Sequence, residues 1–263
     1  MTFSKEGLRF ESVLYDDLRM ALLRREFLVV YQPIVDIASN AVVSREALVR
    51  WQHPKKGMVM PGDFIEAAER MGFILDMTNV VLEQVCRMLN AGGESRSPVP
   101  VSVNLSPVCL AAGGVPDSIR CALERFDALP DQIILEITET AALEPARQVR
   151  AQLEALRAMG IKIVMDDFGT GYSSLLNLSR FPMSGLKVDR SFSVNIPHDA
   201  RVCAIVASMI ELAHKLDLSI VIEGVETRQQ VDWIRQFPNV LAQGYWFGKP
   251  SGIDRARRSR FEA

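Results

Sequence analysis

The sequence has few cysteines and histidines and no long hydrophobic run. Its four cysteines, Cys86, Cys109, Cys121 and Cys203, lie far apart without CxxC spacing, so we expect neither a disulfide framework nor a cysteine zinc site. Its three histidines are scattered, which argues against a histidine zinc site. No apolar run approaches the roughly 18 residues of a membrane span, and no signal peptide is recognisable. These absences predict a reducing, cytoplasmic setting, for a free protein or for the cytoplasmic part of a larger, membrane-tethered one.

An excess of charge of one sign is also lacking. The net charge is −2 and the isoelectric point is near 6.0, so the chain has no general attraction for nucleic acid or anionic lipid. We therefore expect no long nucleic acid as a partner and no membrane contact by this segment. With 48% hydrophobic residues in 263, the chain can bury one large core, which favours a single α/β barrel over two ordinary domains.

Strand-like and helix-like segments alternate along nearly the whole sequence. The pattern predicts strands at 27–36, 41–50, 99–105, 132–138, 161–165, 185–188, 218–222 and 240–242. It predicts helices at 11–22, 61–71, 76–90, 115–125, 145–159, 174–180, 201–215 and 228–236. The tight connection between the first two strands indicates an antiparallel pair. Eight strands separated mostly by helices, in about 250 residues, favour a (β/α)8 TIM-like barrel over an open doubly wound sheet.

The most informative stretch is IKIVMDDFGTGYSS at 161–174. Its apolar, β-branched start predicts a buried strand that ends at Asp166 and Asp167, and a glycine-rich turn follows. Two adjacent carboxylates do not both ionise cheaply without a positive partner, and a divalent cation is the simplest such partner. The turn lacks the lysine of a Walker phosphate loop, so we interpret it as a mobile active-site loop.

Polar residues fall at or near the ends of most predicted strands. They are Glu46, Asn104, Glu136, Asp166, Asp167, Lys187, Glu223 and Gln243. Each carboxylate taken singly is explained as a helix cap or a solvated loop residue. Together at the mouth of a barrel they would repel one another, and a set of oxygen donors selects a hard cation such as Mg²⁺ or Mn²⁺. Because one of two adjacent carboxylates can bridge two ions, the pattern fits the two-ion clamp of phosphodiester hydrolysis.

Two cations have more than one interpretation. Lys187 either holds or deprotonates an attacking water, or it forms a simple salt bridge within the acid cluster. Arg50 shares a strand face with Glu46 and Leu48, so it pairs either with a substrate phosphate or with a neighbouring acid. Trp246 is interpreted as a packing residue or, like Tyr245 near the mouth, as a contact for a base.

The sequence Glu46-Ala-Leu48, followed by Val-Arg50, resembles the signature of EAL-domain cyclic di-GMP phosphodiesterases. Other segments resemble family motifs in the family's order, from about Leu18 to Pro250. They are YQPI at 31–34, VNLS at 103–106, EITE at 136–139, DDFGTGYSS at 166–174, LKVD at 186–189, EGVE at 223–226 and QGYWFG at 243–248. The resemblance implies a barrel with one antiparallel strand, in agreement with the hairpin predicted above.

The resemblance also implies a role for each matching residue. One metal ion would be held by Glu46, Asn104, Glu136 and Asp166. A second ion would be held by Asp166, Asp167 and Glu223, the last two also counting as catalytic. Lys187 would act on the hydrolytic water, and Glu139 would anchor the loop after the fifth strand. Contacts to the dinucleotide would come from Gln32, Leu48, Arg50, Glu226 and Gln243.

The function expected from this resemblance is metal-dependent hydrolysis of cyclic di-GMP to linear pGpG, which lowers the level of this bacterial second messenger. The alternative is a catalytically silent cyclic di-GMP receptor, because many family members have lost metal ligands. This sequence does not depart from the active pattern. A third interpretation, a hydrolase for another phosphodiester such as a short oligonucleotide, is disfavoured because the chain lacks a basic track.

Family members are commonly fused to GGDEF or sensory domains, and the resemblance also suggests a dimer. We therefore expect residues 1–26 to be a lead-in helix from an upstream domain of a longer parent protein, and residues 27–263 to form the barrel. We also expect a homodimer coupled to the loop at 168–174.

Overall fold

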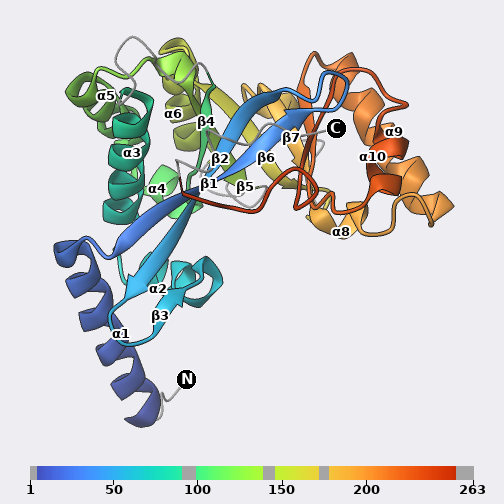
Figure 1. Ribbon diagram of the computed structural model, residues 1–263. Helices are drawn as coiled ribbons and strands as arrows, with labels where there is room; N and C mark the ends of the chain where they lie inside the picture. Colours follow the sequence, from blue (N-terminus) through green and yellow to red (C-terminus); the bar gives the residue numbers. More distant parts are fainter. Residues whose placement is uncertain (1–4, 91–98, 139–145, 172–177, 253–263) are drawn as a thin grey trace.

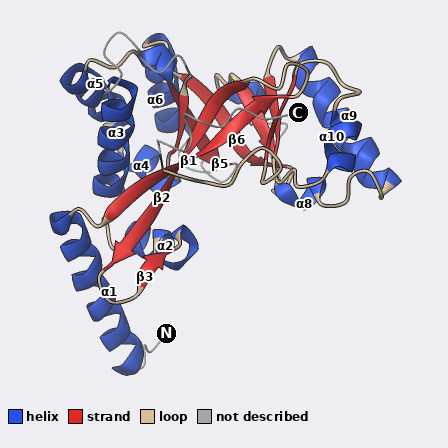
Figure 2. Cartoon of the chain, viewed as in Figure 1, coloured by secondary structure: helices blue, strands red, loops and turns tan. Residues whose placement is uncertain are grey.

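The computed structural model describes residues 5–90, 99–138, 146–171 and 178–252. Eight strands form a closed barrel with helices around it (Figures 1 and 2). They are β1 Phe27–Asp36, β2 Val42–His53, β4 Val101–Asn104, β5 Ile133–Thr138, β6 Lys162–Phe168, β7 Gly185–Val188, β8 Ser219–Ile222 and β9 Val240–Gln243. A short β3, Gly57–Val59, extends the sheet beside the end of β2. The TIM-like barrel predicted from the sequence is confirmed.

One strand of the barrel runs against the others. β1 pairs antiparallel with β2, from Phe27 opposite Trp51 to Val35 opposite Val42, and it also pairs antiparallel with β9. The pairings from β2 through β4 to β9 are all parallel. Because β1 joins both β2 and β9, it closes the barrel. The seven parallel strands therefore direct their C-terminal ends to one mouth.

The helices cover the outside of the barrel, with α3, α5 and α6 on one side and α9 and α10 on the other (Figure 1). The helices described are α1 Lys5–Arg24, α2 Ile65–Arg70, α3 Ile74–Asn90, α4 Pro107–Ala112, α5 Val115–Phe126, α6 Ala146–Ala158, α8 Arg190–Ser193, α9 Ala200–Lys215 and α10 Arg228–Ile234. Four of them, α4, α8, α9 and α10, begin at a side-chain cap. The Asp199 carboxylate accepts hydrogen bonds from the backbone N–H groups of Arg201 and Val202 in α9, and Thr227 forms a capping box with Gln230 at α10. None of the described helices is both long and apolar enough to cross a membrane.

Several boundaries differ from those predicted. The helix expected at 61–71 is split into a 3-10 turn, Pro61–Asp63, and the short α2. β3, α4 and α8 were not predicted, because elements of three to six residues are too short to show a periodic pattern. Most of the helix expected at 174–180 lies outside the described residues.

Two hydrophobic clusters stabilise the fold. The larger one fills the barrel and the layer between strands and helices. The smaller one lies where β1 and β2 extend beyond the barrel, and it joins α1, α2 and the hairpin (Figure 1). Trp51 is at its centre, with its ring 5.7 Å from Phe27 and 5.8 Å from Phe64 between centroids, and its Nε1 donates to Glu26 Oε2 at 3.0 Å. Leu18 of α1 is fully buried in this cluster, so α1 shares a core with β2.

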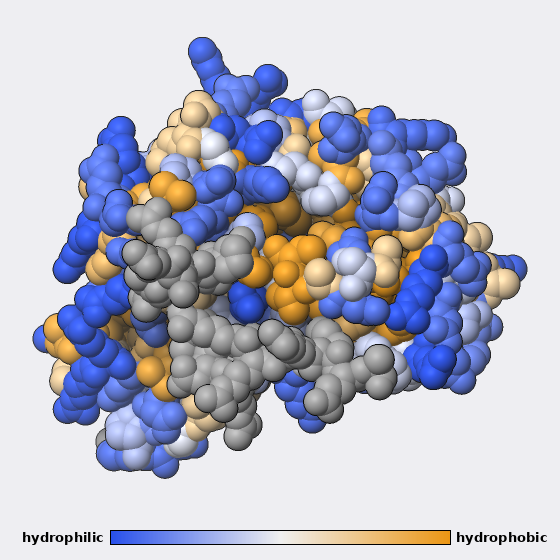
Figure 3. All heavy atoms as spheres, turned by 45° about the horizontal axis from the view of Figure 1, so that its top comes forward, coloured by the Kyte–Doolittle hydropathy of each residue, from blue (hydrophilic) through white to orange (hydrophobic). Residues whose placement is uncertain are grey.

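Hydrophilic and hydrophobic residues are distributed unevenly over the surface. On the face drawn in Figure 3, hydrophilic side chains occupy most of the periphery, and hydrophobic ones are visible near the centre. Among the buried polar residues, Gln32, Glu46, Glu136, Asp166, Lys187 and Gln243 gather at the mouth of the barrel.

Candidate active site

An acidic pocket of about 260 Å³ opens at the mouth of the barrel. Residues of four strands and of the loop after a fifth line it: Gln32 of β1, Glu46 of β2, Asp166 of β6, Glu223 after β8 and Gln243 of β9. All but Gln32 are among the residues that the sequence placed at or near strand ends, and Gln32 was expected to contact the dinucleotide. A barrel gathers the ends of distant strands, so five segments of the chain meet in one pocket.

Lys187 lies at the centre of the acid cluster, on β7, with a side chain that is 1% exposed. Its Nζ lies within ion-pair distance of four carboxylates: 2.6 Å from Glu223, 2.9 Å from Glu136, 3.3 Å from Glu46 and 3.5 Å from Asp166. One ammonium does not neutralise four carboxylates. The cluster therefore keeps a negative charge that favours a further cation.

The pKa values of the cluster follow from this imbalance. Burial alone would lower the pKa of Lys187, but Glu136 and the other three carboxylates raise it well above its usual value. Burial raises the pKa of Glu136 well above its ordinary range, although Lys187 acts in the opposite sense. Burial, with the charges of Asp166 and Glu46, raises the pKa of Glu223 to about 7, against the effect of Lys187. Burial and Asp166 also raise the pKa of Asp167.

The strand that carries the two aspartates does not end at them, which corrects the boundary expected from the sequence. β6 continues to Phe168, and its register with β7 shifts between Met165 and Phe168. Asp167 lies within this irregularity at φ +54°, a conformation that non-glycine residues adopt rarely. In a regular strand, adjacent side chains point to opposite faces. A bulge re-aims them, so both carboxylates contribute to one site.

Asp166, Asp167 and Glu223 can each offer an oxygen such that all three oxygens lie within 4.8 Å of one another. Asp166 Oδ1 is buried and has no hydrogen-bond partner in the described part of the chain. Its ion-pair partner Lys187 Nζ lies 3.5 Å away and is shared with three other carboxylates, so a bound cation would offset the cost of burying this oxygen. Three carboxylates with only oxygen donors fit Mg²⁺ or Mn²⁺.

The other expected metal ligands form a second group around Glu46. Asn104 Nδ2 donates to Glu46 Oε1 at 2.8 Å, and Glu136 lies one strand further, paired with Lys187. Burial would raise the pKa of Glu46, but Lys187 and the hydrogen bonds from Gln243 and Asn104 lower it. The structure thus brings all six expected ligands to the mouth. Three of them, Asp166, Asp167 and Glu223, have carboxylate oxygens within 4.8 Å of one another.

A chain of amides holds Glu46 from the other side. Gln243 Nε2 donates to Glu46 Oε2 at 2.6 Å and also contacts Gln32 Oε1 at 3.2 Å, while Gln32 Nε2 donates to the carbonyl of Gly248 at 3.1 Å. Gln32 and Gln243 were predicted to contact the dinucleotide. In this structure they fix the position of a predicted metal ligand.

The remaining predicted residues lie in different places. Glu226 lines the acidic pocket. Arg50 is half-buried and donates to the carbonyl of Val49 at 2.8 Å; burial lowers the pKa of its guanidinium, although Glu46 and Tyr245 act in the opposite sense. Glu139 and residues 172–177 of the predicted active-site loop lie outside the described residues.

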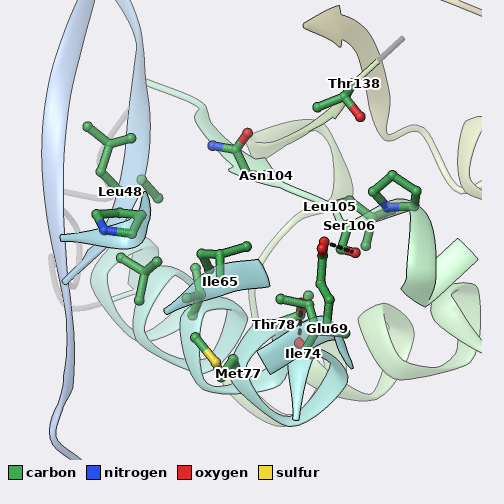
Figure 4. Close-up of a pocket in the computed structure, with 15 residues that line it drawn as sticks. Leu48, Ile65, Glu69, Ile74, Met77, Thr78, Asn104, Leu105, Ser106 and Thr138 are labelled. Atoms are coloured by element: carbon green, nitrogen blue, oxygen red, sulfur yellow. Dashed lines mark hydrogen bonds between the residues drawn. The ribbon is translucent and has the colours of Figure 1, made fainter. Parts of the chain in front are cut away.

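Leu48 and Asn104 line a second pocket, of about 340 Å³, whose walls are mostly apolar (Figure 4). Side chains of α2, α3 and the end of β4 surround it. Its polar groups are paired: Ser106 Oγ donates to Glu69 at 2.7 Å, and Thr78 Oγ1 donates to the carbonyl of Ile74 at 2.8 Å. Because Asn104 belongs to this pocket and also hydrogen-bonds Glu46, the apolar pocket adjoins the acidic cluster.

Three residues that line the acidic pocket were not predicted from the sequence to be site residues. Arg190, Gly224 and Tyr245 line it, although only Tyr245 had been noted near the mouth. Arg190 directly follows the LKVD segment that carries Lys187, so its position after a barrel strand was the signal that could have identified it.

The sequence matches the family model described as EAL domain over residues 15–250. The chain therefore belongs to the EAL domain family. Among curated relatives, it is 42% identical over 240 residues to the bifunctional diguanylate cyclase/cyclic di-GMP phosphodiesterase MucR of Pseudomonas aeruginosa, covering 90% of this chain and 35% of MucR. It is 41% identical over 238 residues to the cyclic di-GMP phosphodiesterase NbdA of the same organism, covering 89% of this chain and 30% of NbdA. The chain thus spans about a third of the length of these relatives.

The fold has solved counterparts of the same family. The structure described as the PaMucR phosphodiesterase in complex with c-di-GMP matches with a TM-score of 0.86 and 40% identity, covering 93% of this chain and 99% of that chain. The EAL enzyme Bd1971, in its form bound to cAMP and cyclic di-GMP, matches with a TM-score of 0.89 and 29% identity, covering 96% of this chain and 69% of that chain.

Proposed function

We propose that this chain hydrolyses cyclic di-GMP to linear pGpG in a reaction that depends on Mg²⁺ or Mn²⁺, and that it lowers the level of this second messenger in a bacterial cell. The observation that carries the proposal is the set of three carboxylates, Asp166, Asp167 and Glu223, with oxygens within 4.8 Å of one another beside the buried ammonium of Lys187. The names of MucR and NbdA, and the c-di-GMP complex of PaMucR, support cyclic di-GMP as the substrate.

The donor set assigns the residues that would hold the metal. Asp166, Asp167 and Glu223 would hold one ion, and Glu46, Asn104 and Glu136, together with Asp166, would hold a second. When bound, such ions supply Lewis acidity toward a phosphoryl oxygen and lower the pKa of a coordinated water.

The protein groups have their own tasks. The four carboxylates that contact Lys187 fix its ammonium next to the acidic pocket, where it holds the attacking water in line with the scissile bond. The amide chain from Gln32 through Gln243 keeps Glu46 from turning away. Burial of this cluster excludes bulk water, which strengthens each of these interactions.

We assign the contacts to the dinucleotide to the residues that were expected from the sequence. Gln32, Glu226 and Gln243 reach the ligand from the acidic pocket, Leu48 from the apolar pocket next to it, and Arg50 from the strand between them. Glu139 anchors the loop after the fifth strand.

We also propose the wider setting. Residues 1–26 lead in from an upstream GGDEF or sensory domain in a longer parent protein, and two copies of the barrel form a homodimer. The greater length of MucR and NbdA supports the first of these proposals.

The experiment that tests the function compares the wild type with Asp166→Asn in a cleavage assay. The variant removes one charge at the centre of the cluster and changes little in shape. Loss of pGpG formation with cyclic di-GMP binding retained supports the proposal. Turnover at the wild-type rate by Asp166→Asn would contradict it.

A further inference from the structure

Arg190 is a cation of the acidic pocket that has no role in the chemistry described so far. It begins α8 and lines the pocket together with Glu226 and Tyr245, and Asp166 and Glu223 line the same pocket. Arg190 Nη2 lies 3.0 Å from Glu226 Oε1, and the two side chains are 59% and 39% exposed. The ion pair therefore lies where the pocket opens to solvent, within reach of a ligand that is bound over the carboxylates.

The backbone holds the Arg190 side chain in this place. Gly224 has φ +68°, and a Cβ there would lie 2.3 Å from Cγ of Arg190. The stem of Arg190 therefore packs directly on the bare backbone of Gly224, which directly follows Glu223. The other end of the pair is also fixed, because the backbone N–H of Glu226 donates to Gln230 Oε1 at 2.7 Å.

The ion pair between Arg190 and Glu226 determines which chemical group can bind at this end of the acidic pocket. A lone arginine would suit a phosphate, but a carboxylate 3.0 Å away repels one. A guanine base instead presents acceptors, O6 and N7, next to donors, N1–H and the exocyclic amino group. A guanidinium beside a carboxylate offers the complementary order of donors and acceptors. Tyr245 adds a half-exposed aromatic ring to the same pocket, as a surface for a base.

We propose that Arg190 and Glu226 together read the edge of one guanine of the bound dinucleotide. Arg190 donates to O6 and N7, and Glu226 accepts from N1–H and the exocyclic amino group. This inference rests on the proposed function, and it makes Arg190 a specificity-determining residue. Adenine lacks O6 and the N1–H, so this pair would reject it.

The test measures KM and kcat of the wild type, Arg190→Gln and Arg190→Lys with cyclic di-GMP and with its 7-deazaguanine analogue, which lacks N7. Arg150→Gln is the matched control: Arg150 is 58% exposed and paired with Glu154 at 2.7 Å, but it lies on α6. Arg190→Lys keeps a positive charge beside Glu226 without the planar fork of donors. Circular dichroism spectra verify that each variant is folded.

For both Arg190 variants we expect KM for cyclic di-GMP to rise about tenfold to a hundredfold, with a smaller change in kcat. The wild type and Arg150→Gln should bind the 7-deaza analogue more weakly than cyclic di-GMP, whereas Arg190→Gln should not distinguish the two. An unchanged KM in Arg190→Gln, or undiminished discrimination by it, overturns the inference while leaving the phosphodiesterase intact. A wild type that neither binds nor cleaves cyclic di-GMP overturns the proposed function itself, and that result appears without any variant.

Discussion

The ammonium of Lys187 lies 2.9 Å from the carboxylate of Glu136, and each side chain is only 1% exposed. An isolated buried pair of this kind adds little to stability, because the loss of hydration offsets most of the attraction. Here the lysine also contacts three further carboxylates at the mouth of the barrel. This excess of acid points to a cation-binding function, since a purely structural salt bridge needs only one partner.

Replacing Lys187 by methionine removes the ammonium and keeps most of the side-chain volume. We expect kcat for cyclic di-GMP to fall by about 10²–10⁴-fold, because the attacking water loses the group that holds it. The control is Lys215→Met, since Lys215 is 70% exposed and forms an ion pair on α9. A Lys187→Met enzyme with kcat close to that of Lys215→Met would show that Lys187 only balances charge.

Addition of Mg²⁺ or Mn²⁺ should raise the melting temperature by several degrees, because the ion binds carboxylates that are gathered only in the folded state. Asp166→Asn should abolish this shift without lowering the melting temperature of the metal-free protein, since it relieves repulsion among the acids. Asp232→Asn, at an exposed ion pair on α10, should respond to metal as the wild type does. Equal shifts in all three proteins would contradict the assignment of the metal site.

The burial of α1 predicts a stability difference between two leucines of one helix. Leu18 is fully buried in the cluster around Trp51, whereas Leu23 is 69% exposed. Leu18→Ala should lower the free energy of unfolding by about 2–5 kcal/mol, and Leu23→Ala should change it by less than about 0.5 kcal/mol. Urea denaturation followed by circular dichroism measures both. Similar values for the two variants would mean that α1 is not part of the folded core.

Cysteine reactivity tests the packing of the barrel. Burial raises the pKa of Cys86 to about 11 and also raises the pKa of Cys109, so both remain protonated thiols at pH 8. Cys121 is exposed. Ellman's reagent should therefore modify Cys121 rapidly in the native protein, and Cys86 and Cys109 only after unfolding in urea. A Cys121→Ser variant should lack the fast phase. Labelling of Cys86 in native protein, detected by mass spectrometry, would contradict the burial described here.

Much of the fold could be predicted because its signals are local. The strand Phe27–Asp36 was predicted with the bounds that the structure has, since a run of apolar residues is bounded there by polar turns. The hairpin after it was recognised from its short connection. β3 and α8 were missed because each has only three or four residues, too few for a periodic pattern to appear.

The chemistry of the site was predictable, but its geometry was not. The sequence identified the oxygen donors from their positions at strand ends. It did not reveal the irregularity at Asp167, because nothing in the residue pattern encodes φ +54° within a strand. Nor did it indicate that Arg190 packs on Gly224, a contact between residues that are distant in the chain and adjacent only after the barrel closes.

The most direct measurement is a product assay on the purified protein, with cyclic di-GMP and either Mg²⁺ or Mn²⁺, and with a chelator as the control. Chromatography separates the cyclic and linear dinucleotides. The account predicts that pGpG appears with metal and that the chelator stops its formation. Intact cyclic di-GMP at every protein concentration, with binding still measurable by calorimetry, would contradict the account, because it would show a receptor that holds a complete set of ligands without using them.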